Sequence, residues 1–205
     1  MSDESLLSEQ SAEADDLVVR ARTDRAAFGQ LYDGFYPHVA RYCLRRLFDR
    51  TLAEDVVSEV FLQVAAHLRG FPGRTTTDFR RWLFRIATNA VNAHLRQARR
   101  RAELWEAAAR SRHGTGGSDS HSSHGEHDLL DWPAVYQQLL ALDERDQTIV
   151  TLRFFGDCSH EEIAEVVNCT PGAVRTALSR VLAALREKFD PTVPLAPRGS
   201  IVPQG

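Results

Sequence analysis

The chain has little of what marks a secreted or a membrane protein. Only three of its 205 residues are cysteines, at the well-separated positions Cys43, Cys158 and Cys169. No CxxC or paired Cys/His pattern surrounds them, so the sequence offers neither a disulfide framework nor a zinc site. No apolar run approaches the roughly 20 residues of a membrane span, and the acidic N-terminus lacks the pattern of a signal peptide. We therefore expect a cytoplasmic protein without membrane insertion.

Lysine is nearly absent, and arginine is unevenly distributed. Lys188 is the only lysine among 25 basic residues, and the net charge of the whole chain is −3. Residues 69–101 nevertheless hold nine arginines and a single acid, Asp78. The planar guanidinium fork suits phosphates and base edges, so this segment indicates a nucleic-acid-binding surface. An ordinary solvated helix face is the alternative.

Residues 111–128 are dominated by Gly, Ser and His and have no apolar periodicity, which is typical of a flexible linker. Three of its histidines are spaced by three and could bind a metal weakly, but we favour a plain linker and expect no cofactor. Both flanking parts have helical apolar spacing. We predict an all-α fold with two small helical domains joined by a flexible linker, the second of them a helix-turn-helix domain. The predicted segments are a disordered acidic N-terminus at 1–14, domains at 15–103 and 130–189, a linker at 104–129 and a Pro-rich tail at 190–205.

Four helices are expected in the first domain. The first spans residues 16–33, and a new helix follows with Pro37 in its first turn, where proline is tolerated. Apolar residues at spacing four place the third helix at 52–68. Two glycines and a proline then interrupt helicity, and the fourth helix spans residues 78–101.

The fourth helix combines an apolar face with a polar one. Phe79, Leu83, Ile86 and Ala90 recur at helical spacing and predict a core face. A second set forms a stripe with a period near 3.6, suited to tracking phosphates: Arg81, Arg85, Thr88, Asn92, Arg96 and Arg99. Trp82 and Phe84 cannot both face the core, so we expect one of them near the stripe, where a base could stack on it.

The C-terminal part carries the pattern of a helix-turn-helix. Ser159 and Glu162 have the spacing of a capping box, Asn168 suits the left-handed residue that ends a helix, and Thr170 with Pro171 begins the next helix. The exposed residues expected near the start of this second helix are small or hydrogen-bonding groups and two arginines, as a groove-reading helix requires: Thr170, Gly172, Arg175, Thr176, Ser179 and Arg180. An ordinary helical hairpin is the alternative.

Two acids one helical turn apart, Asp55 and Glu59, mark the third helix. Like charges at this spacing slightly destabilise an isolated helix. They would suit an arginine-rich partner, although a solvated acidic face would look the same.

Two blocks, "AEDVVSEVFLQVAAHL" with "DFRRWLFRIATNAVNAHLRQARRR" and "LDERDQTIVTLRFFGDCSHEEIAEVVNCTPGAVRTALSRVLAALREKF", resemble the sigma-70 family of bacterial RNA polymerase sigma factors. The layout of two helical domains resembles the extracytoplasmic-function (ECF) group. The resemblance implies a protein without catalytic residues. It would bind core RNA polymerase through positions that match Asp55 and Glu59, and promoter DNA as duplex and as melted single strand. An anti-sigma factor is a further implied partner, whereas no small-molecule substrate is expected.

The resemblance also implies a division of the DNA contacts. Residues 70–78 and the following helix match the part that recognises and melts the minus-ten element, and Asn89 matches an asparagine of its base pocket. The residues expected there are Arg74, Arg81, Trp82, Arg85, Thr88, Asn89, Asn92 and Arg96. The helix-turn-helix matches the reader of the minus-thirty-five element through the six residues named above.

Two other functions are weighed against a sigma subunit. A free-standing helix-turn-helix regulator would need a receiver or ligand domain, whereas the first half shows a basic aromatic helix. A metal-responsive or catalytic protein built on the histidine segment lacks a carboxylate constellation and a phosphate loop. The sequence also allows a closed state in which the two halves pack on each other and separate on polymerase, which we state as a hypothesis.

Overall fold

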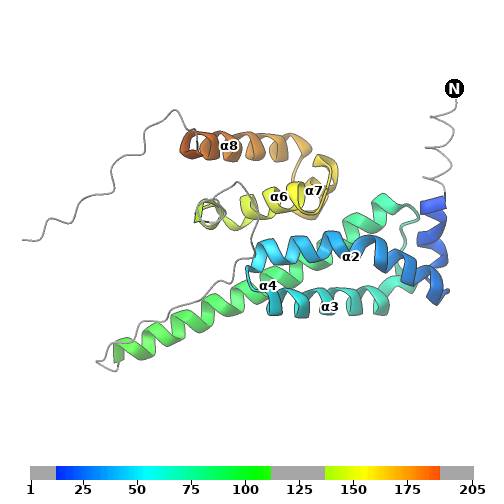
Figure 1. The fold of residues 1–205 in the computed structure, drawn as a ribbon, viewed down its shortest axis with the longest axis horizontal. Coiled ribbons are helices and arrows are strands. Elements are labelled where there is room, and N and C mark those ends of the chain that lie inside the picture. The colour runs from blue at the N-terminus through cyan, green and yellow to red at the C-terminus, as the bar shows by residue number, and fades with distance from the viewer. Residues whose placement is uncertain (1–12, 112–136, 190–205) are drawn as a thin grey trace, which may run out of the picture.

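The computed structural model describes residues 13–111, the N-terminal half, and residues 137–189, the C-terminal half (Figure 1). A helix at residues 13–20 precedes α2 (Arg25–Leu47), α3 (Arg50–His67), the 3₁₀ turn η1 (Leu68–Gly70) and α4 (Thr76–Ser111). Helical residues 137–140 precede α6 (Glu144–Phe154), α7 (His160–Val166) and α8 (Pro171–Phe189). Every regular element in these two ranges is helical, which confirms the predicted fold class.

The helix boundaries of the N-terminal half are set by short polar caps. The Asp24 carboxylate accepts a hydrogen bond from the Ala26 N–H at 2.8 Å, and Asp49 accepts one from the Leu52 N–H at 3.0 Å. Each satisfies an N–H that the first helical turn would leave unpaired. Phe48, which ends α2 directly before Asp49, takes the left-handed conformation with a φ of 55°. These caps separate α2 from the preceding helix and from α3.

Pro37 corrects one predicted boundary, because it lies inside α2 rather than at the start of a new helix. Proline removes one intrahelical hydrogen bond and normally kinks or ends a helix. Leu31 and Phe35 before it, and Val39 and Tyr42 after it, are all buried in the same core. We attribute the continuity of α2 to this packing, which holds both sides of the proline.

The start of the predicted linker is a second correction. α4 continues to Ser111, so residues 104–111 are helical. Their sequence, "LWEAAARS", is rich in alanine and other strong helix formers, which favours continuation of the helix. The rest of the predicted linker, with its histidines, lies outside the described residues, as do residues 1–12 and the tail from 190.

The C-terminal half follows the sequence prediction closely. Ser159 and Glu162 form the expected reciprocal capping box at the start of α7. Asn168 is left-handed with a φ of 54°, and the Thr170 hydroxyl accepts a hydrogen bond from the Ala173 N–H at 3.2 Å at the start of α8. Ile163, Ala164, Val174 and Leu178 are buried between the two helices. The helix-turn-helix is therefore present.

The two halves pack directly against each other. In Figure 1, α6 and α7 lie between α8 and the layer formed by α2 and α4, while α3 lies on the far side of that layer. Gly156, after α6, lies so close to the buried Phe84 of α4 that a Cβ atom there would come within 3.1 Å of its ring. Buried apolar side chains of the two halves form one cluster. No helix in the described residues is long and apolar enough to cross a membrane.

Candidate nucleic-acid interface

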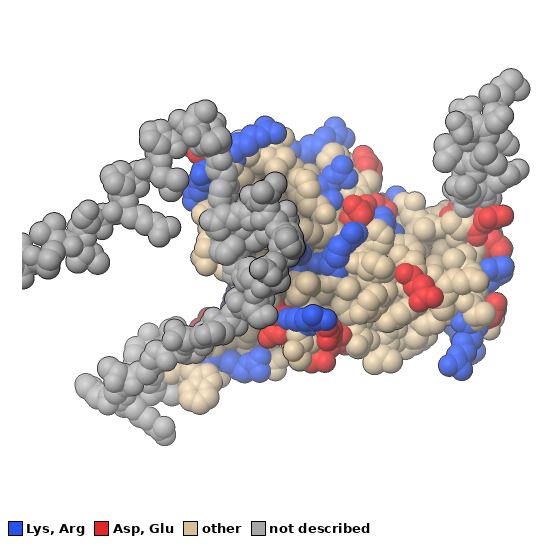
Figure 2. Space-filling view, viewed as in Figure 1, with Lys and Arg blue, Asp and Glu red and all other residues tan. Residues whose placement is uncertain are grey.

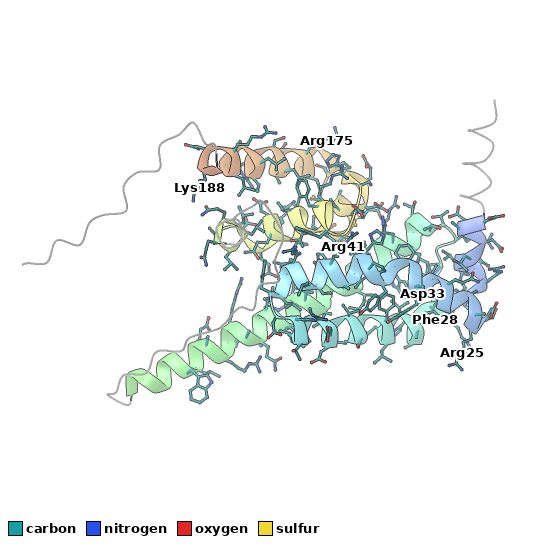
Figure 3. The ribbon with its side chains drawn as sticks, viewed as in Figure 1. Arg25, Phe28, Asp33, Arg41, Arg175 and Lys188 are labelled. Atoms are coloured by element: carbon teal, nitrogen blue, oxygen red, sulfur yellow. The ribbon has the colours of Figure 1, made fainter. Side chains whose placement is uncertain are left out.

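The first candidate surface is the outer face of α8. All six residues predicted to read the minus-thirty-five element are exposed there: Thr170, Gly172, Arg175, Thr176, Ser179 and Arg180. Two are engaged locally, since the Thr176 hydroxyl donates to the Gly172 carbonyl at 3.0 Å and Arg180 donates to the Asp146 carboxylate of α6. Figure 3 places Arg175 at the N-terminal end of α8, on the side away from α2 and α4. Figure 2 shows lysine and arginine side chains along this outer edge.

The second candidate surface begins at the loop before α4. The Asp78 carboxylate accepts hydrogen bonds from the N–H groups of Arg74 and Thr75, each at 3.2 Å, and the Thr75 hydroxyl accepts from the Asp78 N–H at 3.0 Å. Hydrogen bonding of the carboxylate to the side chain and the backbone N–H of Thr75 lowers the pKa of Asp78. The loop is therefore closed on itself at the helix N-terminus.

The N-terminal helix and the turn after it also hold this loop. The Asp15 carboxylate accepts a hydrogen bond from the Thr76 N–H at 2.7 Å, and Arg22 donates to the Gly73 carbonyl. A Cβ atom on Gly73 would lie 2.4 Å from the Phe71 ring and 2.6 Å from the Asp78 Cβ. The position therefore requires glycine, and the loop has a defined shape before any ligand binds.

The predicted residues along α4 do not share one exposed stripe. Arg85, Asn89 and Arg96 of α4 are exposed, as is Arg74 of the loop, whereas Arg81, Trp82 and Asn92 are half-buried. Thr88 corrects the prediction: it is buried, and its hydroxyl lies 2.9 Å from that of the buried Tyr42 on α2. The core-facing pairing of two hydroxyls takes Thr88 out of any surface available to DNA in this arrangement.

The two aromatic residues of α4 differ in burial. Phe84 is fully buried, with its ring edge-on to Tyr42 at a centroid distance of 5.7 Å. Trp82 is half-buried and stacks on Phe71 of the loop, with centroids 4.6 Å apart and planes inclined by 20°. Trp82 therefore joins the loop to α4.

The C-terminal half covers part of the basic face of α4. Arg81 forms an ion pair with Glu165 of α7 at 2.8 Å, and Arg85 donates to the Glu165 backbone carbonyl at 3.0 Å. Arg80 donates to the Asp157 carbonyl, in the α6–α7 loop, at 3.1 Å. Sequence reasoning did not identify Asp157 or Glu165, because nothing local to these acids indicates partners 77 or 80 residues away.

Helix α2 extends this contact around Asp157. The Asp157 carboxylate lies 3.1 Å from Arg41 and 3.2 Å from the Nδ1 atom of His38. Burial lowers the pKa of His38, and the nearby Arg80 and Arg41 lower it further, which together outweigh the opposing effect of Asp157. His38 therefore favours its neutral form in this setting. Figure 3 shows Arg41 on the side of α2 that faces the C-terminal half.

Arg46 is the most deeply buried arginine at the interface between the two halves. Only 4% of it is exposed, and it donates to the Gln147 side chain of α6 at 2.5 Å and to the Asn92 side chain of α4 at 3.1 Å. Its Nε group is buried without a partner among the described residues. Asn92, predicted to contact DNA, thus accepts a hydrogen bond from Arg46 at this interface.

The acidic pair of α3 lies on the opposite side of the N-terminal half from α7. Asp55 is exposed, and Glu59 is half-buried with its carboxylate 3.1 Å from the Gln63 amide and 3.2 Å from His94 of α4. Leu62, one turn beyond Glu59, is 71% exposed. This leucine was not identified from sequence, although its helical spacing from the two acids was a usable signal.

The described residues contain no cluster of side chains suited to a metal ion. Burial raises the pKa values of the Cys43 and Cys158 thiols to about 12, so both behave as small apolar groups rather than nucleophiles. What the described part of the chain offers is binding chemistry: arginine forks, a stacked tryptophan beside a shaped loop, and a capped helix with a polar outer face.

Comparisons with known proteins give a consistent picture. The family model for sigma-70 region 2 matches residues 31–101, and that for sigma-70 region 4 matches residues 133–185. The ECF RNA polymerase sigma factor BldN of Streptomyces coelicolor is 33% identical over 178 residues, which cover 85% of this chain and 65% of that protein. The ECF RNA polymerase sigma-E factor of Haemophilus influenzae is 30% identical over 175 residues, covering 82% of this chain and 90% of that protein.

Solved structures share the fold. CnrH in complex with the cytosolic domain of CnrY aligns with a TM-score of 0.63 and 24% identity, covering 88% of this chain and 99% of that one. The sigma factor RpoE of Bartonella quintana, in complex with the anti-sigma factor NepR, aligns with a TM-score of 0.62 and 19% identity, covering 81% of this chain and 98% of that one.

Proposed function

Because the chain belongs to the ECF group of the sigma-70 family, we propose that it binds bacterial core RNA polymerase and directs promoter-specific initiation of transcription. The C-terminal half would recognise the minus-thirty-five element. The N-terminal half would recognise and melt the minus-ten element. The observation that carries the proposal is the presence, in one chain, of an exposed helix-turn-helix and a separate basic helix with a shaped loop at its start.

The helix-turn-helix would bind duplex DNA. The N-terminal part of α8 would enter the major groove, where Arg175 can read a guanine edge and the hydroxyls of Thr176 and Ser179 can bond to bases or phosphates. Arg180 is already paired with Asp146. To contact the phosphate backbone, it would exchange the Asp146 carboxylate for a phosphate.

The N-terminal half would capture melted DNA. Arg74, Arg85 and Arg96 would follow the phosphates, and Asn89 would bond to an unstacked base beside the loop at residues 70–78. Unstacking costs a few kcal/mol per base. A loop that is already shaped by Asp78, Asp15 and Arg22 loses little entropy on binding, so more of its contact energy is available to offset that cost.

Docking to polymerase would use α3. Asp55 and Glu59 would pair with basic residues of the polymerase, and the exposed Leu62 beside them would provide an apolar contact that is removed from water on binding. We propose that the protein acts in the cytoplasm, together with its polymerase. An anti-sigma factor is a further proposed partner, and the RpoE complex with the anti-sigma factor NepR supports it.

In vitro transcription from a genomic fragment library, with purified core polymerase, tests this function. The expected result is a set of discrete start sites that appear only when the protein is added, with shared sequences upstream. Protein that binds duplex DNA alone, yet creates no new start sites, would instead favour a free-standing helix-turn-helix regulator. The variant Asp55→Arg/Glu59→Arg should lose the start sites while keeping its fold, because it reverses the charge of the docking face.

A further inference from the structure

The loop at residues 70–78 is held on one side by a segment that lies outside the surfaces proposed to bind DNA. This segment is the helix at residues 13–20, dark blue in Figure 1, together with the turn that follows it, and it stands beside the loop. Its side chains Val18 and Ala21 are buried in the hydrophobic core. The segment is therefore fixed in position, and the contacts that it makes with the loop fix the loop as well.

Two polar side chains of this segment bond to the backbone of the loop. The Asp15 carboxylate accepts a hydrogen bond from the Thr76 N–H at 2.7 Å, and Arg22 donates to the Gly73 carbonyl. The bonded backbone groups lie on either side of the two N–H groups that bond to Asp78. The partners are 61 and 51 positions apart in the sequence, so these two bonds fix the loop against the rest of the domain.

The other side of the loop is open to a ligand. Pro72, Arg74 and Thr77 are exposed, whereas Gly73 and Thr76 are half-buried. The two anchored residues are thus direct neighbours in the chain of the exposed ones. A shift of either anchored backbone group therefore moves the groups of the loop that a base could contact.

Arg22 contributes more to the position of the loop than to the stability of the fold. Its side chain is half-buried, and its Nε group is buried without a partner among the described residues. An unpaired buried N–H of a charged group costs free energy, which offsets much of the gain from the bond to Gly73. We therefore expect removal of Arg22 to displace the loop more than it lowers the free energy of unfolding.

We propose that Asp15 and Arg22 are positioning residues for base selection, which hold the loop at residues 70–78 where it can distinguish one unstacked base from the other three. This inference rests on the proposed function, because it requires that the loop receives a base of the minus-ten element. Hydrogen bonds to a base edge depend on distance and direction, so they need a loop that is fixed in place. Attraction between arginines and phosphates carries no sequence information. Loss of the two contacts therefore reduces the preference for the promoter base and leaves the sequence-independent affinity for melted DNA unchanged.

The test uses the full-length chain assembled with core polymerase, on premelted templates made from a promoter that the transcription assay identifies. The templates carry each of the four bases in turn at every unpaired non-template position of the minus-ten element. Base preference is the affinity for the promoter base divided by the affinity for the substituted bases, measured by fluorescence anisotropy at fixed salt concentration. In the variant Asp15→Ala/Arg22→Gln we expect this preference to fall about tenfold at one position or more, because small displacements of a binding group cost large factors. The affinity for the substituted templates should stay unchanged.

A matched control comes from the same helix. Asp16 and Arg20 form an exposed ion pair at 3.4 Å, so their side chains bond to each other rather than to the loop. The variant Asp16→Ala/Arg20→Gln makes the same exchange of residue types and should keep the wild-type base preference. Denaturant unfolding of each protein checks that the fold is kept. If the Asp15/Arg22 variant does not fold, Arg22→Gln alone is measured in its place, with a smaller fall in base preference expected.

An unchanged base preference in the Asp15/Arg22 variant would overturn the inference, and so would an equal fall in the control variant. A loss of affinity by the same factor on every template would also overturn it, because such a loss reflects binding in general. These three outcomes leave the proposed function standing. Wild-type holoenzyme without a base preference at any position of the minus-ten element would instead count against the proposed recognition of that element, and would overturn the inference with it.

Discussion

At the scale of the residue, the arginines of this protein stand in unequal surroundings. Arg74 and Arg96 are exposed, whereas Arg81 is held against a carboxylate and Arg46 is buried against amides. Desolvation of a guanidinium group is offset by a carboxylate much better than by an amide. The ion pair of Arg81 with Glu165 thus stabilises the packing of the two halves. Burial of Arg46 against neutral amides reduces that stability.

His38 shows how the charges at the contact between the two halves are divided. Burial lowers its pKa, and Arg80 and Arg41 lower it further, while Asp157 raises it. Both arginines belong to the N-terminal half, as His38 does, whereas Asp157 belongs to the C-terminal half. The Asp157 carboxylate therefore balances basic side chains that the N-terminal half brings together.

Thr88 supplies a prediction about stability. The variant Thr88→Val keeps the shape of the side chain but removes the hydroxyl that pairs with the buried hydroxyl of Tyr42, which should cost about 1–3 kcal/mol in the free energy of unfolding. Denaturant unfolding measures this cost, and the double variant Tyr42→Phe/Thr88→Val should recover part of it. If stability is unchanged and binding of single-stranded DNA is weaker, the original prediction that Thr88 contacts DNA would be supported instead.

At the scale of the element, sequence patterns correctly predicted the helix ends that are set by contacts between neighbouring residues. The capping box of α7, the left-handed Asn168 and the Thr170–Pro171 start of α8 involve contacts within a few residues, so the helix-turn-helix could be predicted from sequence. The continuity of α2 through Pro37 could not, because it depends on packing against α3 and α4. Thr88 was placed on the wrong side of α4 for the same reason, since its partner Tyr42 is 46 residues away.

The two elements that we propose bind DNA should respond differently to mutation. Arg175→Ala removes a proposed base-edge contact of α8 and should weaken binding of the holoenzyme to duplex promoter by about tenfold or more. Asn89→Ala should leave that initial binding unchanged and impair promoter opening. Mobility-shift assays on duplex and on premelted templates separate the two effects. Equal losses for both variants on a premelted template would contradict this division.

At the scale of the whole molecule, the arrangement of the halves is the property that sequence could least predict. The contacts of Arg80 and Arg85 with residues 157 and 165 span about 80 positions, and arginine-rich faces look alike whether they meet DNA or protein carboxylates. The sequence allowed a closed state as a hypothesis, and the structure identifies the residues that would hold it together. In this structure the basic helix noted in the sequence contacts acceptor groups of the C-terminal half through Arg80, Arg81 and Arg85.

The central claim is that this chain directs polymerase to promoters and melts them. Permanganate probing of unpaired thymines, at a promoter found by the transcription assay, tests it most directly. Core polymerase with the chain should make thymines in the minus-ten region reactive, while core polymerase alone or the chain alone should not. Stable binding of polymerase and chain to that promoter without any reactive thymine, under conditions in which a premelted control reacts, would contradict the account.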